Sequence, residues 1–204
     1  MHVDTCPFII SHVLGIEKSN HISDLIRRIN KTYNCTDHCS LECENGGKVN
    51  HNCLCECGYA FEGERCEMLT KQRLFTDSNC GIYDKSNGII SLSTYPESIN
   101  RGIFCQWLIR APPEYKIEFV INEIDIDTDS VPLSQFCNDL LLIWGTLDIE
   151  EKISCKNLSQ LNGKAMISDS NWLLIELRMN PWSERYRKGP YISYRHVEPV
   201  FQEG

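Results

Sequence analysis

The sequence predicts a mainly β protein, in which a small disulfide-rich module precedes an antiparallel β-sandwich and a short helical segment precedes both. Three observations predict this class. Seven of the 12 cysteines crowd between Cys35 and Cys66, apolar and polar residues alternate after Cys80, and a single apolar stripe marks residues 20–33.

The composition of the 204 residues excludes several classes of protein. A formal net charge of −8 without a Lys/Arg-rich block argues against a nucleic-acid partner, because such proteins neutralise phosphates with basic residues. No apolar run approaches the roughly 20 residues of a membrane-spanning helix. With 42% hydrophobic and 24% charged residues the chain is globular, and its cysteines indicate disulfides formed in an oxidising compartment.

The first element is a predicted helix over residues 20–33. Five apolar residues follow helical spacing and form one stripe, namely Ile22, Leu25, Ile26, Ile29 and Tyr33. A helix this short is marginal alone in water, and the preceding residues offer little core to cover the stripe. We therefore expect its packing partner to lie outside this chain.

The second element is a cysteine-rich knot between Cys39 and Cys66. A segment of this length cannot bury enough apolar surface to fold without cross-links. Zinc is the alternative to disulfides, but single-residue spacing between Cys53, Cys55 and Cys57 suits zinc pairs poorly. The spacing by itself leaves many disulfide pairings open.

The third element is a β-sandwich between Cys80 and Val197. Apolar residues alternate with charged ones over residues 115–121 and again over residues 173–179. Turn residues such as Asn162-Gly163 and Lys188-Gly189-Pro190 separate these strands, and the segment is long enough for one complete core.

The knot resembles an EGF-like module. The resemblance lies in Cys43-Glu44-Asn45-Gly46-Gly47, Cys55-Glu56-Cys57-Gly58-Tyr59 and Gly63-Glu64-Arg65-Cys66. It implies three disulfides, Cys39–Cys53, Cys43–Cys55 and Cys57–Cys66. The acidic entry of calcium-binding EGF modules is absent, so no metal is assigned to this module.

The sandwich resembles a CUB domain. The resemblance lies in Cys80-Gly81, Gly88-Ile89-Ile90-Ser91, Cys105-Gln106-Trp107-Leu108-Ile109, Cys137-Asn138-Asp139-Leu140 and Gly189-Pro190-Tyr191-Ile192-Ser193-Tyr194. It implies two disulfides, Cys80–Cys105 and Cys137–Cys155.

Many CUB domains bind calcium, and the resemblance places a weak calcium site at Asp127, Asp139 and Asn180. Two carboxylates and one amide are poorer ligands for calcium than the three carboxylates of the family, because this hard cation prefers charged oxygen donors. The alternative is that Asp125, Asp127 and Asp129 form a solvated acidic loop.

The residues before the knot resemble the end of an astacin zinc-metalloproteinase domain. The resemblance lies in residues 23–35, from Ser23-Asp24-Leu25 to Tyr33-Asn34-Cys35, and in Met1-His2-Val3. The family's zinc motif, HExxHxxGxxH, is absent, so we expect no peptide hydrolysis and no zinc ligands in this chain. Cys6 and Cys35 then become the default remaining disulfide.

These resemblances divide the chain into five parts. We expect an astacin remnant over residues 1–38, an EGF-like domain over 39–67, a linker over 68–79, a CUB domain over 80–197 and a tail over 198–204. Three Asn-x-Ser/Thr motifs, at Asn30, Asn34 and Asn157, favour secretion and glycosylation.

Two functions remain open. The chain is either the accessory EGF–CUB region of an astacin-like protein, or a secreted EGF–CUB binding protein unrelated to proteolysis. CUB domains commonly bind through loops at one end of the sandwich. The candidates are the acidic loop near residues 125–129 and the loop Trp182–Lys188. In the second loop Trp182, Arg185, Tyr186 and Arg187 are the expected contact residues, and the alternative is a solvated hairpin tip. Expected partners are extracellular proteins or protease substrates, with oligomerisation through the CUB domain.

Overall fold

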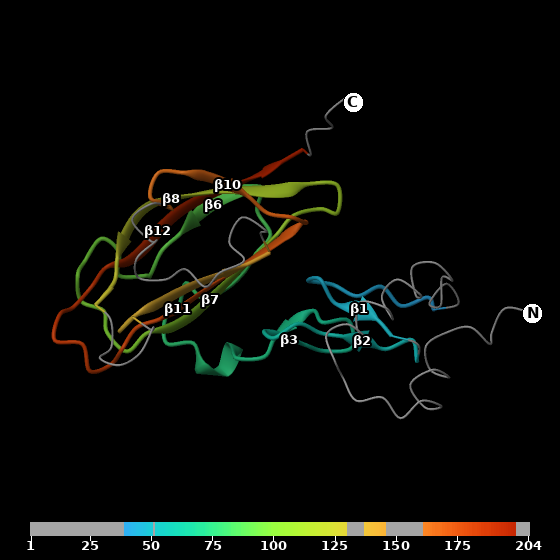
Figure 1. Cartoon of the computed structure of the whole chain (residues 1–204), viewed down its shortest axis with the longest axis horizontal. Helices are drawn as coiled ribbons and strands as arrows, with labels where there is room; N and C mark the ends of the chain where they lie inside the picture. Colours follow the sequence, from blue (N-terminus) through green and yellow to red (C-terminus); the bar gives the residue numbers. More distant parts are fainter. Residues whose placement is uncertain (1–38, 51, 130–136, 146–160, 199–204) are drawn as a thin grey trace, which may run out of the picture. The chain divides into compact units, whose positions relative to one another are not determined.

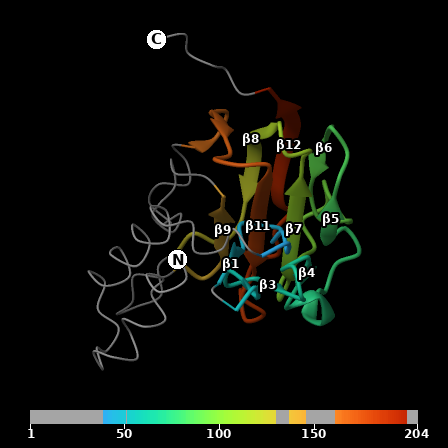
Figure 2. The ribbon, with the colours of Figure 1, turned by 90° about the vertical axis from the view of Figure 1, so that its right-hand side faces the viewer.

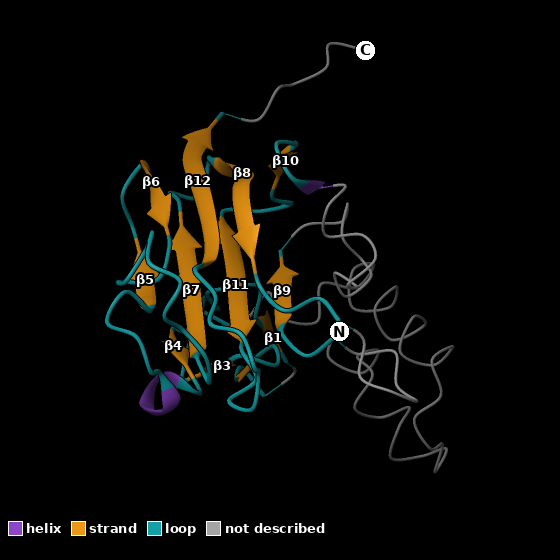
Figure 3. Ribbon diagram, turned by 90° about the vertical axis from the view of Figure 1, so that its left-hand side faces the viewer, coloured by secondary structure: helices purple, strands orange, loops and turns teal. Residues whose placement is uncertain are grey.

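A computed structural model describes residues 39–50, 52–129, 137–145 and 161–198 (Figure 1). The chain divides into two compact units, Met1–Thr70 and Lys71–Gly204. The predicted helix over residues 20–33 lies outside the described residues. The mainly β class is confirmed, because strands make up nearly all of the described regular structure, beside the short 3-10 turn η2 (Gln72–Leu74) and a helical residue at Leu161 (Figure 3).

The described part of the first unit, residues 39–50 and 52–70, contains three disulfides, in the pairing that the EGF-like resemblance implies. They join Cys39 to Cys53, Cys43 to Cys55 and Cys57 to Cys66. The strands described in this unit form two short antiparallel pairs, β1 (Lys48–Val49) with β2 (Cys55–Glu56) and β3 (Phe61–Glu62) with β4 (Met68–Leu69).

Two details of this unit follow from the crowding of its cross-links. A Cβ at Gly47 would lie 2.6 Å from the Cys66 sulfur, so only glycine fits there. The strand β4 lies inside the predicted linker, and its pairing with β3 makes Met68 and Leu69 part of the first unit.

The described strands of the second unit form a sandwich of two four-stranded sheets (Figures 1 and 2). One sheet has the order β10-β8-β12-β6 and the other has the order β5-β7-β11-β9. The strands are β5 (Gly81–Tyr83), β6 (Asn87–Ile90), β7 (Phe104–Arg110), β8 (Lys116–Asp125), β9 (Leu140–Trp144), β10 (Ala165–Ile167), β11 (Trp172–Arg178) and β12 (Gly189–Val197).

Among the described strands, every pairing in the sandwich is antiparallel except one. The alternating stretches predicted over residues 115–121 and 173–179 form most of β8 and β11. The short edge strand β5 pairs in parallel with β7. The disulfide Cys80–Cys105 joins the residue before β5 to β7, so this parallel pair is cross-linked at one end.

The core lies between the two sheets and is almost entirely apolar. Alternate residues of β8 (Ile117, Phe119, Ile121) meet alternate residues of β7 and β11, because successive side chains of a strand point to opposite faces. Trp107 and Phe119 are fully buried there.

The outer faces of the two sheets differ. In β7 and β11 the residues between the core positions are also buried, namely Gln106, Leu108, Leu174 and Glu176. Glu176 lies between Arg178 and Gln106, and both bind its carboxylate. On the outer face of the other sheet, Ile89 is exposed and Glu118 pairs with the exposed Arg195.

Candidate interaction site

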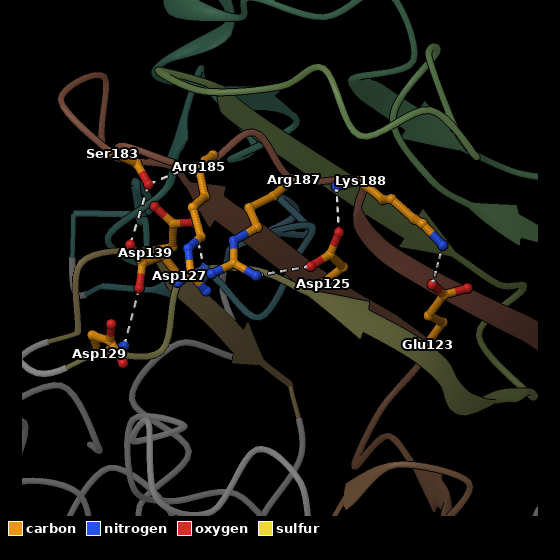
Figure 4. Close-up of polar contacts among 9 residues, drawn as sticks. All are labelled: Glu123, Asp125, Asp127, Asp129, Asp139, Ser183, Arg185, Arg187 and Lys188. Atoms are coloured by element: carbon orange, nitrogen blue, oxygen red, sulfur yellow. Dashed lines mark hydrogen bonds and ion pairs between the residues drawn. The ribbon is translucent and has the colours of Figure 1, made fainter.

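Three segments that are distant in the sequence meet at one end of the sandwich (Figure 4). They are the end of β8 with residues 126–129, the residues just before β9, and the connection between β11 and β12. Aspartates come from the first two segments, and hydrogen-bond donors and cations come from the third.

Asp139 is the buried centre of this arrangement, with 1% of its surface exposed. The backbone N–H groups of Asp127 and Asn180 donate to its two carboxylate oxygens, each at 2.7 Å. Burial raises the pKa of Asp139 above the usual aspartate range, although the two backbone hydrogen bonds act in the opposite direction. Asp139 thus joins all three segments through one side chain.

Asp127 lies beside Asp139 and is also buried. Its Oδ2 accepts hydrogen bonds from the Ser183 hydroxyl at 3.1 Å and the Asn138 amide at 3.3 Å. Its Oδ1 accepts one from the backbone N–H of Asp129 at 3.2 Å. The alternative of a solvated acidic loop is therefore wrong for Asp127, whereas Asp129 is exposed.

Asp125 receives two donors from the connection between β11 and β12. Arg187 Nη1 lies 3.2 Å from its Oδ1, and the backbone N–H of Lys188 donates to its Oδ2 at 2.9 Å. The predicted contact residue Arg187 is thus engaged inside the molecule, with only 23% of its side chain exposed.

A second polar group continues this edge along β8. The Tyr95 hydroxyl donates to Glu123 at 2.6 Å, and the Lys188 ammonium donates to the other carboxylate oxygen at 2.9 Å. These two hydrogen bonds lower the pKa of Glu123. The Tyr95 ring stacks on Tyr191 with 4.8 Å between ring centroids, which holds the hydroxyl group that binds Glu123.

The loop that leaves this cluster presents aromatic side chains to solvent. Trp182 is 87% exposed and Tyr186 is 50% exposed. The Arg101 guanidinium lies 4.9 Å from the centre of the Tyr186 ring, in cation–π geometry. Arg185 is exposed as well, so three of the four predicted contact residues are accessible.

The loop is fixed at its base although its tip is exposed. The backbone N–H of Trp182 donates to the Asn180 amide oxygen at 2.9 Å. At the other end, the backbone groups of Arg187 and Asn100 exchange two hydrogen bonds, at 3.0 and 3.1 Å. The short segment Ile99–Arg101 is thereby held beside the loop, and Ile99 is exposed there.

The residues of the predicted calcium site come together but do not fit a site made of three carboxylates. Both Asp139 oxygens, both Asp127 oxygens and the Asn180 amide oxygen each accept a protein hydrogen bond. Asn180 brings no charge. A guanidinium at Arg187 adds positive charge near the place where a calcium ion would bind, which disfavours a second cation.

Several predicted sites cannot be compared with the structure. The expected disulfide Cys6–Cys35, the expected glycosylation sites Asn30, Asn34 and Asn157, and Cys155 lie outside the described residues. Cys137 is disulfide-bonded. Within the described ranges, no three His, Cys, Asp or Glu side chains are grouped in a way that could hold a metal ion.

The sequence analysis missed four contributors to the site. Ser183 and Asn138 bind Asp127, while Asn100 and Arg101 support the loop from a distant segment. Asn138 and Ser183 each adjoin a residue that was singled out, so a search of sequence neighbours could have found them. Nothing in the local sequence around Asn100 predicts its pairing with Arg187.

The fold and this loop-bearing end define a disulfide-linked β-sandwich module. The chain belongs to the CUB-domain family, whose model matches residues 79–194, more than half of the sequence. The CUB resemblance of the sequence is thereby confirmed.

Relatives include proteinases and other proteins. Zinc metalloproteinase dpy-31 of Caenorhabditis elegans is 34% identical over 98 residues, which are 46% of this chain and 16% of that protein. Fibropellin-3 of Strongylocentrotus purpuratus is 28% identical over 141 residues, which are 63% of this chain and 24% of that protein. The resemblance to zinc metalloproteinases is confirmed, and the chain spans less than a quarter of either relative's length.

A solved structure of the CUB1-EGF-CUB2 domain of human MASP-1/3 also resembles the chain. It shares 15% identity and a TM-score of 0.45, over 76% of this chain and 55% of that one. Among the described residues, no helix combines the length and the apolar character needed to cross a membrane.

Proposed function

We propose that the chain is the EGF–CUB accessory region of an extracellular protein related to astacin-like zinc metalloendopeptidases, and that it binds a protein partner. The similarity to zinc metalloproteinases supports the relationship. The four described disulfide pairs support an oxidising compartment, since cytosolic thiols stay reduced. Any catalytic zinc would be bound by residues outside this chain.

One observation carries the binding proposal: the exposed aromatic loop on a rigid base. Trp, Tyr and Arg dominate the binding energy of protein interfaces, and Trp182, Tyr186 and Arg185 stand together on this loop. The hydrogen bonds at both ends of the loop reduce the entropy lost on binding. In a proteinase, such a region would hold a substrate protein or a second subunit near the catalytic domain.

A second candidate function is an EGF–CUB binding protein unrelated to proteolysis. The observation that favours it is the match to fibropellin-3, which extends over 63% of this chain and so exceeds the CUB domain alone. The two candidates share the binding loop and differ in what precedes it. Sequencing the full transcript separates them, because an in-frame HExxH motif upstream is required by the first and absent in the second.

The binding proposal can be tested by site-specific photocrosslinking. A photoreactive phenylalanine analogue replaces Tyr186 in the full chain, which is then incubated in the medium of cells that express it. We expect a discrete crosslinked protein at this position, and loss of that product in the Trp182→Ala background, because the two side chains share one contact surface.

A matched control places the same analogue at Tyr59, an exposed aromatic residue of the first unit. Equal labelling at both positions, or labelling at Tyr186 that survives Trp182→Ala, contradicts a specific surface on this loop. Crosslinking of the chain to itself would identify the partner as a second copy, which analytical ultracentrifugation would then show as a dimer.

A further inference from the structure

The acidic end of the sandwich needs positive charge or donors to be stable. Asp125, Asp127 and Asp139 converge there, and two of them are buried. Buried carboxylates are stable only when hydrogen-bonded or paired with a cation. In a calcium-binding domain the metal ion supplies this positive charge.

Hydrogen bonds within the protein connect the three segments at this end of the sandwich. Asp139 binds one backbone N–H from the segment after β8 and one from the segment after β11. Ser183 adds a hydroxyl from the aromatic loop to Asp127. The end of β8, the start of β9 and the loop are therefore cross-linked without a metal.

Arg187 supplies the charge. Its guanidinium points into the aspartate cluster and pairs with Asp125 at 3.2 Å (Figure 4). Its backbone is fixed by the two hydrogen bonds with Asn100, and the next residue also donates its backbone N–H to Asp125. The Arg187 side chain is only 23% exposed and is held at both its backbone and its guanidinium, so it offsets part of the negative charge of the cluster with little further loss of conformational freedom.

We propose that Arg187, together with these backbone and hydroxyl donors, takes the place of calcium at this end of the sandwich. The aromatic loop is then ordered in the absence of metal. Asn180 belongs to the same replacement, because its neutral amide reduces the negative charge that Arg187 must balance. This inference concerns the organisation of the loop and holds whichever partner the loop binds.

The first test compares the thermal unfolding of the full chain in EDTA and in about 2 mM calcium, a concentration above the dissociation constants typical of extracellular calcium modules. Tryptophan fluorescence is the readout, because Trp107, Trp144, Trp172 and Trp182 all lie in the second unit. We expect the same Tm in both solutions. A rise of about 3 °C or more with calcium would overturn the proposal.

The second test removes the arginine charge. Arg187→Met keeps the aliphatic stem, and Arg195→Met is the matched control because Arg195 pairs with Glu118 on an exposed face. We expect Arg187→Met to lower the Tm by about 4 °C or more and the control by less than about 2 °C. Equal effects of the two variants would contradict a special role for Arg187.

The third test restores the calcium chemistry. The double variant Asn180→Asp/Arg187→Met has a third carboxylate and no competing cation. We expect calcium to raise its Tm by about 3 °C or more relative to EDTA, whereas wild type does not respond. If calcium does not raise the Tm of the folded double variant, Arg187 and Asn180 do not replace the metal, and the proposal is wrong. If it fails to fold, the EDTA comparison on wild type still decides the claim.

Discussion

The two sheets of the sandwich have outer faces of opposite character, although both contribute alternating strands to one core. On the sheet β10-β8-β12-β6, outward residues such as Ile89 and Arg195 are exposed to solvent. On the sheet β5-β7-β11-β9, Leu108 and Glu176 point away from the core and are nevertheless 0% exposed. Because the sheet β5-β7-β11-β9 is buried on both faces, we expect substitutions in it to destabilise the fold more than substitutions on the outer face of the other sheet.

The largest expected difference comes from truncating matched apolar residues on the two outer faces. Leu108→Ala should lower the free energy of unfolding by about 2–5 kcal/mol, because it leaves a cavity in a buried layer. Ile89→Ala, on the exposed face, should cost less than about 1 kcal/mol. Urea unfolding followed by tryptophan fluorescence measures both. Similar losses would show that the two faces do not differ energetically.

A smaller difference is expected for the two glutamate–arginine pairs. Glu176 is buried between Gln106 and Arg178, so Glu176→Ala should cost about 2–3 kcal/mol by leaving these two donors without their carboxylate. Glu118→Ala removes a pair whose arginine is 64% exposed and should cost about 1 kcal/mol or less. The same urea titrations provide the measurement, and equal costs would argue that Glu176 contributes no more than a surface pair.

The smallest expected effects are changes of stability with pH, and they have opposite signs. The hydrogen bond with Arg195 lowers the pKa of Glu118, so its stabilising contribution is present above the unfolded pKa and is lost as pH falls through the folded one. Burial raises the pKa of Asp139, so its contribution is fully present below the unfolded pKa and is lost as pH rises through the folded one.

Carboxyl-carbon NMR titration can resolve these two groups individually. The Glu118 resonance should titrate below the usual glutamate range, and the Asp139 resonance should titrate above the usual aspartate range. A low Asp139 midpoint would mean that its hydrogen bonds outweigh its burial.

The two long alternating strands and the described disulfides could be predicted from the sequence, because alternation and cysteine order are local patterns. Period-two alternation identified β8 and β11, and cysteine order together with the EGF and CUB resemblances led to the described disulfides. The outer-face burial of Leu108 and Leu174 interrupts that alternation. Trp107-Leu108-Ile109 and Leu173-Leu174-Ile175 are continuous apolar stretches. Such stretches are typical of strands that are buried on both faces.

The site was predictable in part. Trp182, Tyr186 and Arg185 were found from loop composition, since exposure at a sandwich end follows from their position after a strand. The internal role of Arg187 was missed because its partners, Asp125 and Asn100, are far away in sequence. Such pairings depend on how the sheets close, and that information is spread over the whole domain.

The disulfide between Cys80 and Cys105 has a mechanical consequence. Tension applied to the chain before Cys80 would reach β5, an edge strand that could otherwise be peeled from its sheet one hydrogen bond at a time. The covalent bond instead transfers the load to β7, an inner strand of that sheet. The domain should therefore resist pulling as a unit in single-molecule force measurements, and reduction should lower its unfolding force.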